Sequence, residues 1–353
     1  MKEVSVQNLT EGMVIAVDVT TKSGQRVLEK GAKLDKQTIM RLSFYNIPTV
    51  LIQEDEVKVA PKAYSQTIKQ SDKFKSFQMD HTMVIAALHN SFEGYVNQGI
   101  PLDLEDLLSK VQELFDSCKT SLELFNMLHN MHTSDDSIYA HSLNVTLICR
   151  QIGKWMKVDD AELRLMTLCG LLHDIGELKV PAEILDKPGK YTDEEFEMVK
   201  MHTQYSYELL APLPIDQHIK YAALSHHERF DGSGYPAGTS QDEIDEYAML
   251  VAIADVYDAM TTVRAHRAPL CAFQVIETVE KEGLQKYNPK YILPFLKQMA
   301  GTYQNHRIML NDGRSANVVM INQHNLSRPI IQMDDGSCID LSTTPDLYIH
   351  KVV

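Results

Sequence analysis

The chain has 353 residues, and 44% of them are apolar, which is enough to fill a sizeable core in two or three domains. Its 34 Lys and Arg residues against 48 Asp and Glu residues give a formal net charge of -14, which disfavours non-specific binding to nucleic acid or to anionic lipid. The five cysteines are scattered and no stretch reaches about 20 consecutive apolar residues, so we expect a cytoplasmic protein without disulfides, nucleic-acid partners or membrane segments.

Residues 1–60 are predicted to form a small α+β module. Strand patterns at 13–19 and 48–52 flank a helical pattern at 35–47. Residues 301–353 return to strand patterns around the hairpin signals NDGR and DDGS. Because each end is too small to bury much core alone, the two are predicted to pack together as one β-containing unit.

Residues 61–132 are polar with recurring apolar positions, which predicts a helical connector that Ile100 and Pro101 interrupt. This connector either mediates a homodimer or forms a solvated amphipathic linker. Residues 133–300 contain long helical patterns. The chain is therefore predicted to be mainly α, with β-rich modules at both ends.

The first helical pattern of residues 133–300 carries a histidine where a core residue is expected. Apolar residues spaced by three and four run from Ile138 onward, and His141 lies on the same stripe. The next pattern ends in LLHDIGELKV, which is predicted to place His173 and Glu177 on one face of a single helix.

Further ionisable residues occupy predicted core positions. A third helix opens with the capping box Thr192 to Glu195 and aligns His202 with apolar neighbours. The remaining residues of this kind are Asp174, His226, His227 and Asp255. One such histidine is more often a hydrogen-bonded core residue than a ligand. Seven residues in register favour a metal site, because unpaired buried carboxylates are costly.

The predicted ligand set constrains the ion. Imidazole and carboxylate without thiolate suit iron or manganese, with zinc as an alternative, and seven ligands exceed one tetrahedral site. Asp174 is predicted to be shared between two ions. The other ligands divide into His141, His173 and Asp255 for one ion and His202, His226 and His227 for the other. Two such ions present a bridging hydroxide and clamp the oxygens of an in-line displacement at phosphorus, which predicts phosphoester hydrolysis.

These motifs resemble an HD-GYP domain, the branch of the HD superfamily that degrades cyclic di-GMP in bacteria. The resemblance spans about 133–300 and rests on HSLNV at His141, HDIG at 173–176, HHERFDGSGYP at 226–236 and IADVYDAMT at 253–261. It implies an all-helical core with a two- or three-metal centre held by the seven residues named above. It also implies substrate contacts from a Gly-rich loop and from the RAHR stretch: Gly234, Tyr235, Arg264 and Arg267. Lys187 would add attraction for an anionic substrate.

The resemblance implies that a metal-bridging hydroxide hydrolyses a phosphodiester bond of cyclic di-GMP to give pGpG, with further hydrolysis to GMP left open. Asp174 and Glu177 are the residues expected at the reaction centre. Two alternatives remain. One is a receptor that binds cyclic di-GMP without turnover, and the other is a hydrolase of another cyclic dinucleotide, such as a hybrid GMP-AMP ring.

Glu177 departs from the family pattern, which usually has Lys at this position. The resemblance implies that this Lys contacts a substrate phosphate, and reversing its charge about 4 Å from the phosphate changes the pair energy by about 8 kcal/mol at an effective dielectric of about 20. We therefore interpret Glu177 as a metal ligand or a water-orienting group. The alternative is a carboxylate paired with a nearby cation: Lys179, Lys187 or Arg229. Ser137 stands where members with a third metal carry Glu, so two ions are expected and a third is left open.

Overall fold

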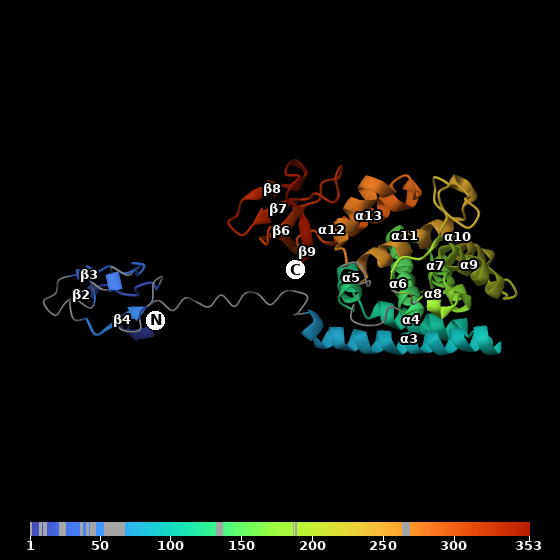
Figure 1. Cartoon of the computed structure of the whole chain (residues 1–353), viewed down its shortest axis with the longest axis horizontal. Helices are drawn as coiled ribbons and strands as arrows, with labels where there is room; N and C mark the ends of the chain where they lie inside the picture. Colours follow the sequence, from blue (N-terminus) through green and yellow to red (C-terminus); the bar gives the residue numbers. More distant parts are fainter. Residues whose placement is uncertain are drawn as a thin grey trace. The chain divides into compact units, whose positions relative to one another are not determined.

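The computed structural model describes residues 2–6, 9, 13–20, 26–35, 38–39, 42, 47–52, 68–131, 137–185, 187, 189–262 and 269–353. The chain divides into two compact units, residues 1–62 and 63–353, which Figure 1 colours along the sequence. Helices dominate the second unit, and small antiparallel sheets occur near both ends of the chain. The predicted fold class is therefore confirmed.

Two short antiparallel pairs form the first unit. β1 (Lys2–Ser5) pairs with β4 (Thr49–Ile52), and β2 (Val19–Thr20) pairs with β3 (Arg26–Leu28). Apolar side chains from these strands and from the turns between them make a separate small core.

The predicted strand at 13–19 is only partly a strand. Val14 and Ile15 form isolated bridges, and the regular pairing is restricted to its last residue, Val19. Ile15 is fully buried, so its inward position follows from the apolar pattern even where the ladder is broken. In the predicted helix at 35–47, the described residues Thr38, Ile39 and Leu42 are helical, and most other positions lie outside the described residues.

The second unit begins with the segment predicted as a connector, which contains α3 (Asp72–Gln98), α4 (Leu104–Asp116) and α5 (Ser121–Asn130). Helix α3 ends because Gly99 adopts a φ of 69°, a left-handed conformation that favours glycine. Pro101 then separates α3 from α4, as the sequence predicts.

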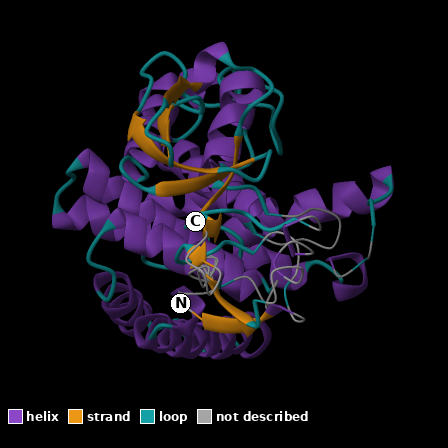
Figure 2. Cartoon of the chain, turned by 90° about the vertical axis from the view of Figure 1, so that its left-hand side faces the viewer, coloured by secondary structure: helices purple, strands orange, loops and turns teal. Residues whose placement is uncertain are grey.

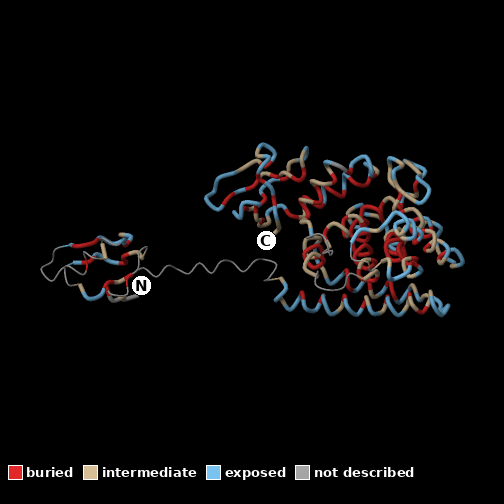
Figure 3. Tube along the Cα trace, in the orientation of Figure 1, coloured by how far each residue is buried: buried red, intermediate tan, exposed pale blue. Residues whose placement is uncertain are grey.

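One face of α3 is buried along its length, and Figure 3 shows these positions alternating with exposed ones. The buried apolar residues are Phe74, Phe77, Val84, Leu88 and Phe92, and they pack against α4 and α6. The amphipathic pattern of this segment thus serves the main core of the second unit.

The central helices are α6 (Ile138–Met156), α7 (Asp160–Leu172), α8 (Ala182–Leu185), α9 (Asp193–Leu210), α10 (Gln217–Ser225), α11 (Glu246–Thr261), α12 (Ala272–Thr278) and α13 (Pro289–Thr302). Short helical turns lie at η2 (Ile175–Lys179), η3 (Gln241–Glu243) and η4 (Val279–Gly283). Helix α6 packs against α7 and α11, and α10 packs against α7, α9 and α11. The predicted capping box of α9 is confirmed, since Thr192 and Glu195 bond each other's backbone N–H.

A five-stranded antiparallel sheet ends the chain, with the order β8 (Cys338–Asp340), β7 (Ile330–Met333), β6 (Ser315–Met320), β5 (Arg307–Leu310) and β9 (Ile349–Val352). The turn η5 (Leu341–Thr343) follows β8. Both predicted hairpins are present, β5 with β6 and β7 with β8. Figure 2 shows the sheet as a layer of strands beside the helices, and β9 packs on α12.

The inward residues of this sheet share a core with α12 and α13. The predicted packing of residues 301–353 with residues 1–60 stays a prediction. Among the described helices, none combines the length and the apolar character that crossing a bilayer requires.

Candidate metal centre

The structure brings the seven predicted ligands together from five helices. They are His141 in α6, His173 and Asp174 at the end of α7, His202 in α9, His226 and His227 at the end of α10, and Asp255 in α11. Five of them are buried, and His141 and His227 are half-buried. Because each helix packs its apolar stripe inward, these side chains meet in the interior of the second unit.

Asp174 lies at the middle of the cluster. Its Oδ2 is 3.5 Å from His141 Nε2 and 3.0 Å from His173 Nε2. Its Oδ1 is 3.3 Å from His202 Nε2 and 3.2 Å from His226 Nε2. The two oxygens of one carboxylate thus face two different pairs of imidazoles.

Asp255 closes the other side of the cluster. Its Oδ1 is 3.3 Å from His141 Nε2, and its Oδ2 is 3.8 Å from His227 Nδ1. The His227 ring lies 4.2 Å from that of His226 and 5.1 Å from that of His202. His227 therefore belongs with the second histidine pair.

Two overlapping groups of side chains could each hold an ion. In each group the donor atoms all lie within 4.8 Å of one another, and the groups are Asp174, His202, His226 and His227, and His141, His173 and Asp174. Asp174 is common to both. This division follows the one that the sequence predicts, with Asp255 added through its contact with His141.

Hydrogen bonds orient three of the imidazoles toward the cluster. The Nδ1–H groups donate to carbonyl oxygens of their own helices: His173 to Gly170, His202 to Val199 and His226 to Ala222, at 2.8, 2.6 and 3.1 Å. In a neutral ring, Nε2 is then an acceptor, and it faces a carboxylate that can only accept. Such atoms at about 3 Å are stable only if a second proton or a cation lies between them.

Two buried atoms of the cluster, His173 Nε2 and Asp174 Oδ1, have no hydrogen-bond partner among the described residues. Buried polar atoms are normally paired, and an unpaired one indicates a missing ion or water. Convergent imidazole nitrogens and carboxylate oxygens without thiolate fit a divalent transition metal. The residues therefore suit the metal centre that the sequence predicts.

The electrostatics favour the protonation states that metal ligands need at four of the seven residues, whereas Asp255 and Asp258 raise the pKa of His141 against the effect of its burial. Burial lowers the pKa of His226, and burial together with His226 lowers the pKa of His227. Burial opposes ionisation of Asp174 and Asp255, yet their histidine neighbours outweigh it and hold both pKa values below the usual range. Burial also opposes protonation of His202, but Asp174 raises its pKa to about 9, so an ion would compete with a proton there.

Asp258 is a functional candidate that the sequence reasoning missed. Its Oδ2 accepts a hydrogen bond from His141 Nδ1 at 2.8 Å, and the residue is 4% exposed. This bond leaves His141 Nε2 directed at Asp174 and Asp255. Carboxylates in this place fix the tautomer of a ligating histidine and raise its basicity. The sequence did contain a signal for Asp258. It follows Asp255 by three residues, a spacing that puts both aspartates on one face of α11.

We expect Asp258→Ala to weaken binding of Mn²⁺ by about 10–100-fold, the usual effect of removing such a partner. Asp258→Asn should lose less, because its amide oxygen still accepts the His141 bond. Calorimetric titration with Mn²⁺ measures both. Asp116→Ala, at the exposed end of α4, is the matched control. Equal affinity in Asp258→Ala and the unaltered protein would show that Asp258 does not position His141.

The helix that carries His173 ends sooner than predicted. Helix α7 stops at Leu172, and the 3₁₀ turn η2 follows, so the prediction of one helix through Glu177 is wrong. Gly176 explains the turn. Its N–H donates to Ser206 Oγ at 2.8 Å, and a Cβ on it would lie 2.2 Å from the carbonyl oxygen of His202. This close approach locks η2 onto α9.

Glu177 nevertheless lies in the field of the cluster. Burial and then Asp174 raise its pKa to about 7, while three of the histidines act in the opposite direction. Among the described residues, no ion pair joins Glu177 to Lys179, Lys187 or Arg229. Lys187 instead donates to both oxygens of Glu195, at 2.8 and 2.6 Å.

The predicted substrate loop lies directly over the histidines. The ring of Tyr235 is 4.7 Å from that of His227. Gly234 is required by packing, because a Cβ there would lie 2.4 Å from both His227 O and Arg229 N. Arg229 is engaged with the backbone oxygens of His226 and Glu228. The predicted contacts Arg264 and Arg267 lie outside the described residues.

Glu228 is a second residue that the sequence reasoning missed. It is 3% exposed, and its Oε1 accepts hydrogen bonds from Ala237 N at 2.7 Å and Gly238 N at 3.1 Å. A buried carboxylate that holds loop N–H groups ties this loop to the histidines that precede it.

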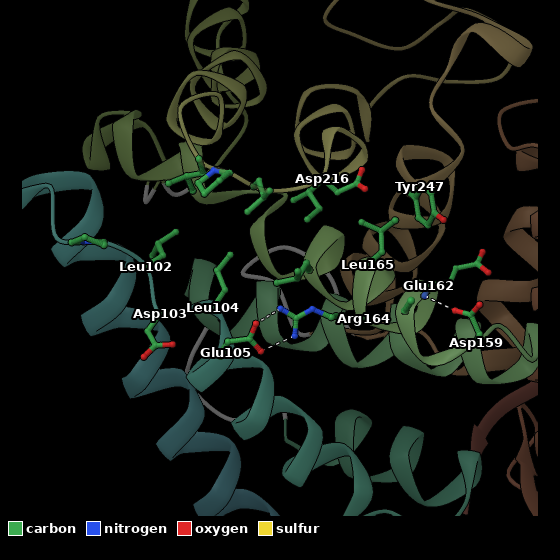
Figure 4. Close-up of a pocket in the computed structure, with 17 residues that line it drawn as sticks. Leu102, Asp103, Leu104, Glu105, Asp159, Glu162, Arg164, Leu165, Asp216 and Tyr247 are labelled. Carbon is green, nitrogen blue, oxygen red and sulfur yellow. Dashed lines mark hydrogen bonds and ion pairs between the residues drawn. The ribbon is translucent and has the colours of Figure 1, made fainter.

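A groove of about 990 Å³ lies elsewhere in the second unit, where α4, α7 and α10 begin (Figure 4). Arg164 crosses toward Glu105 and donates to both of its oxygens, at 2.8 and 2.5 Å. The described residues that line the groove include none of the seven predicted metal ligands. The groove is therefore separate from the metal cluster.

Comparison with known proteins gives consistent matches. The model of a family described as HD domain matches residues 104–291, more than half of the chain. The chain is 34% identical over 201 residues to a cyclic di-GMP phosphodiesterase of Pseudomonas aeruginosa, covering 57% of this chain and 48% of the relative. It is 35% identical over 178 residues to a cyclic di-GMP phosphodiesterase of Thermotoga maritima, covering 50% and 48%.

A third relative is the 3'3'-cGAMP-specific phosphodiesterase 2 of Vibrio cholerae, 27% identical over 253 residues, covering 68% of this chain and 48% of the relative. The chain thus spans about half the length of the curated relatives that it matches.

Proposed function

The chain belongs to the HD domain family, in its HD-GYP branch, and from this premise we propose that it hydrolyses a phosphodiester bond of cyclic di-GMP to give pGpG. The observation that carries the proposal is the carboxylate of Asp174, whose two oxygens face separate histidine pairs. A shared carboxylate of this kind suits two neighbouring ions better than one.

We infer that two divalent ions bind here, iron or manganese in preference to zinc. The first would be held by His141, His173 and Asp255 and the second by His202, His226 and His227, with Asp174 between them. When bound, such ions supply a water activated as a nucleophile at neutral pH and neutralise charge on phosphoryl oxygens. A third ion is left open.

The protein's own residues would position the substrate. The Tyr235 ring packs on the His227 ring and would line one side of the substrate site. We propose Arg264 and Arg267 as contacts to the second phosphate, because guanidinium groups bind phosphate with fixed geometry. Lys187 would act only through its charge, since its ammonium is held by Glu195. Glu177 would act as a ligand or orient the attacking water.

Hydrolysis of 3'3'-cGAMP is the second candidate. The relative from Vibrio cholerae that is named for this substrate matches 68% of the chain, a larger share than the two cyclic di-GMP relatives reported above. The two rings have the same pair of phosphodiesters, so the same centre would act on both, and the bases would decide between them.

The test is incubation of the Mn²⁺-loaded chain with cyclic di-GMP and, in parallel, with 3'3'-cGAMP, followed by chromatography of the products. Formation of pGpG from cyclic di-GMP is the expected result, and faster cleavage of the GMP-AMP ring would favour the second candidate. The chain stripped of metal by a chelator is the control and should regain activity with Mn²⁺. A ligand that binds and stays intact would contradict hydrolysis and identify a receptor.

A cytoplasmic location and a homodimer formed through residues 61–132 stay predictions from the sequence.

A further inference from the structure

Helix α9 carries an exposed aromatic ring with an ammonium group beside it. Phe196 is 44% exposed, so part of its ring is open to solvent. Lys200 follows four residues later, on the same side of the helix, and its Nζ lies 5.0 Å from the centre of the Phe196 ring. The pair forms a cation–π contact at the surface of α9.

Tyr235 connects this pair to the metal cluster. Its ring is 6.2 Å from the ring of Phe196, edge to face, and 5.8 Å from Lys200 Nζ. On its other side it is 4.7 Å from the ring of His227 and 6.4 Å from that of His202. The exposed pair is therefore one aromatic ring away from the metal ligands.

The charge of Lys200 is available to a ligand. Its Nζ is 2.5 Å from an oxygen of Glu197, which is 71% exposed. The Lys200 side chain is 25% exposed. Because its partner Glu197 is largely in solvent, the pair contributes little, and the ammonium can exchange the carboxylate for phosphate. Two other cations near the cluster are engaged, Lys187 with Glu195 and Arg229 with backbone oxygens. In a chain of net charge -14, a cation at this place attracts an anionic substrate locally.

We propose that Phe196 and Lys200 form a binding site for the half of a cyclic purine dinucleotide that does not react. A purine base stacks on the exposed side of the Phe196 ring, and the Lys200 ammonium adds a further contact to the phosphate that is not at the metal cluster. Aromatic side chains hold bases in this way without regard to which base is present. The inference rests on the proposed function, since it concerns the substrate of the same centre.

The experiment compares two substrates on the full, Mn²⁺-loaded chain. Cyclic di-GMP has bases and a second phosphate, whereas bis(p-nitrophenyl) phosphate has neither. We expect Phe196→Ala to raise KM for cyclic di-GMP about tenfold, the usual size of one lost base stack. We expect Lys200→Gln to raise it by about tenfold as well, through the loss of one hydrogen bond between charged groups. Turnover of the aryl diester and the Mn²⁺ content should change by less than about twofold. Phe196→Trp and Lys200→Arg should restore KM.

Met198→Ala is the matched control, because Met198 is 48% exposed on the same helix. A loss of equal size on both substrates would assign Phe196 and Lys200 a structural role and overturn the inference. So would an unchanged KM for cyclic di-GMP in both variants. These results leave the proposed function standing, whereas failure of the unaltered protein to cleave or bind either cyclic dinucleotide overturns both proposals.

Discussion

Replacing Asp174 with asparagine is expected to abolish hydrolysis and to weaken binding of the divalent ions. The carboxylate is 4% exposed and meets four histidine Nε2 atoms at 3.0 to 3.5 Å. Asparagine keeps the shape, but it removes the charge and turns one oxygen into a donor. Removing one partner of a buried charged set costs about 3–5 kcal/mol, which corresponds to about 10²- to 4 × 10³-fold if the whole loss appears in ion affinity.

The readout for Asp174→Asn combines Mn²⁺ titration with the melting temperature. An ion that binds only the folded chain raises its stability, by about 2.7 kcal/mol at 100 times the Kd, so the unaltered protein should melt higher with Mn²⁺. The variant should lose most of that rise, and Asp116→Asn, a surface carboxylate on α4, should keep it. Binding of Mn²⁺ by Asp174→Asn with unaltered affinity would contradict the shared role of this carboxylate.

Helical periodicity was sufficient to predict much of the site. On α6, Val145, Ile148 and Ile152 are buried on the stripe that contains His141. A packed helix turns its apolar stripe to the core, so an ionisable residue on that stripe must point inward as well. Because five helices each contributed such a residue, a common meeting point followed without knowledge of their arrangement.

The supporting residues were not predictable in the same way. The partner of Asp258 is His141, 117 positions away, and helical spacing does not reveal which residue on another helix an inward side chain meets. Glu228 binds N–H groups of a loop whose path the sequence does not specify. Both bonds depend on tertiary contacts, which local patterns cannot express.

The same limit explains the wrong prediction for the helix after His173. The residues continue at helical spacing through Glu177, but the backbone turns at Gly176 and packs directly on the backbone of α9. Only glycine allows this approach, since any Cβ would overlap a carbonyl oxygen of the neighbouring helix. Glu177 thus lies in the electrostatic field of the cluster on η2, and not on a continued α7 as periodicity predicts.

Replacing Glu177 with lysine is expected to lower the metal content and the turnover of the protein. Asp174 and three histidines of the cluster shift the pKa of the Glu177 carboxyl. Within the described part of the chain, this carboxyl forms no ion pair with a lysine or arginine. A lysine here would put a positive charge beside divalent cations, and each such pair costs about 8 kcal/mol at 4 Å and an effective dielectric of about 20, twice the value for two unit charges. The metal content and turnover of Glu177→Gln should lie between those of the unaltered protein and those of Glu177→Lys, because glutamine removes the negative charge and adds no positive one.

Metal content after dialysis against Mn²⁺ and turnover of cyclic di-GMP measure both variants, and Glu183→Lys on the exposed surface of α8 is the control for added charge. Full metal content with faster turnover in Glu177→Lys would mean that position 177 contacts phosphate. The ligand hypothesis would then be wrong. Because the two roles of this position require side chains of opposite charge, the direction of the change in Glu177→Lys decides between them.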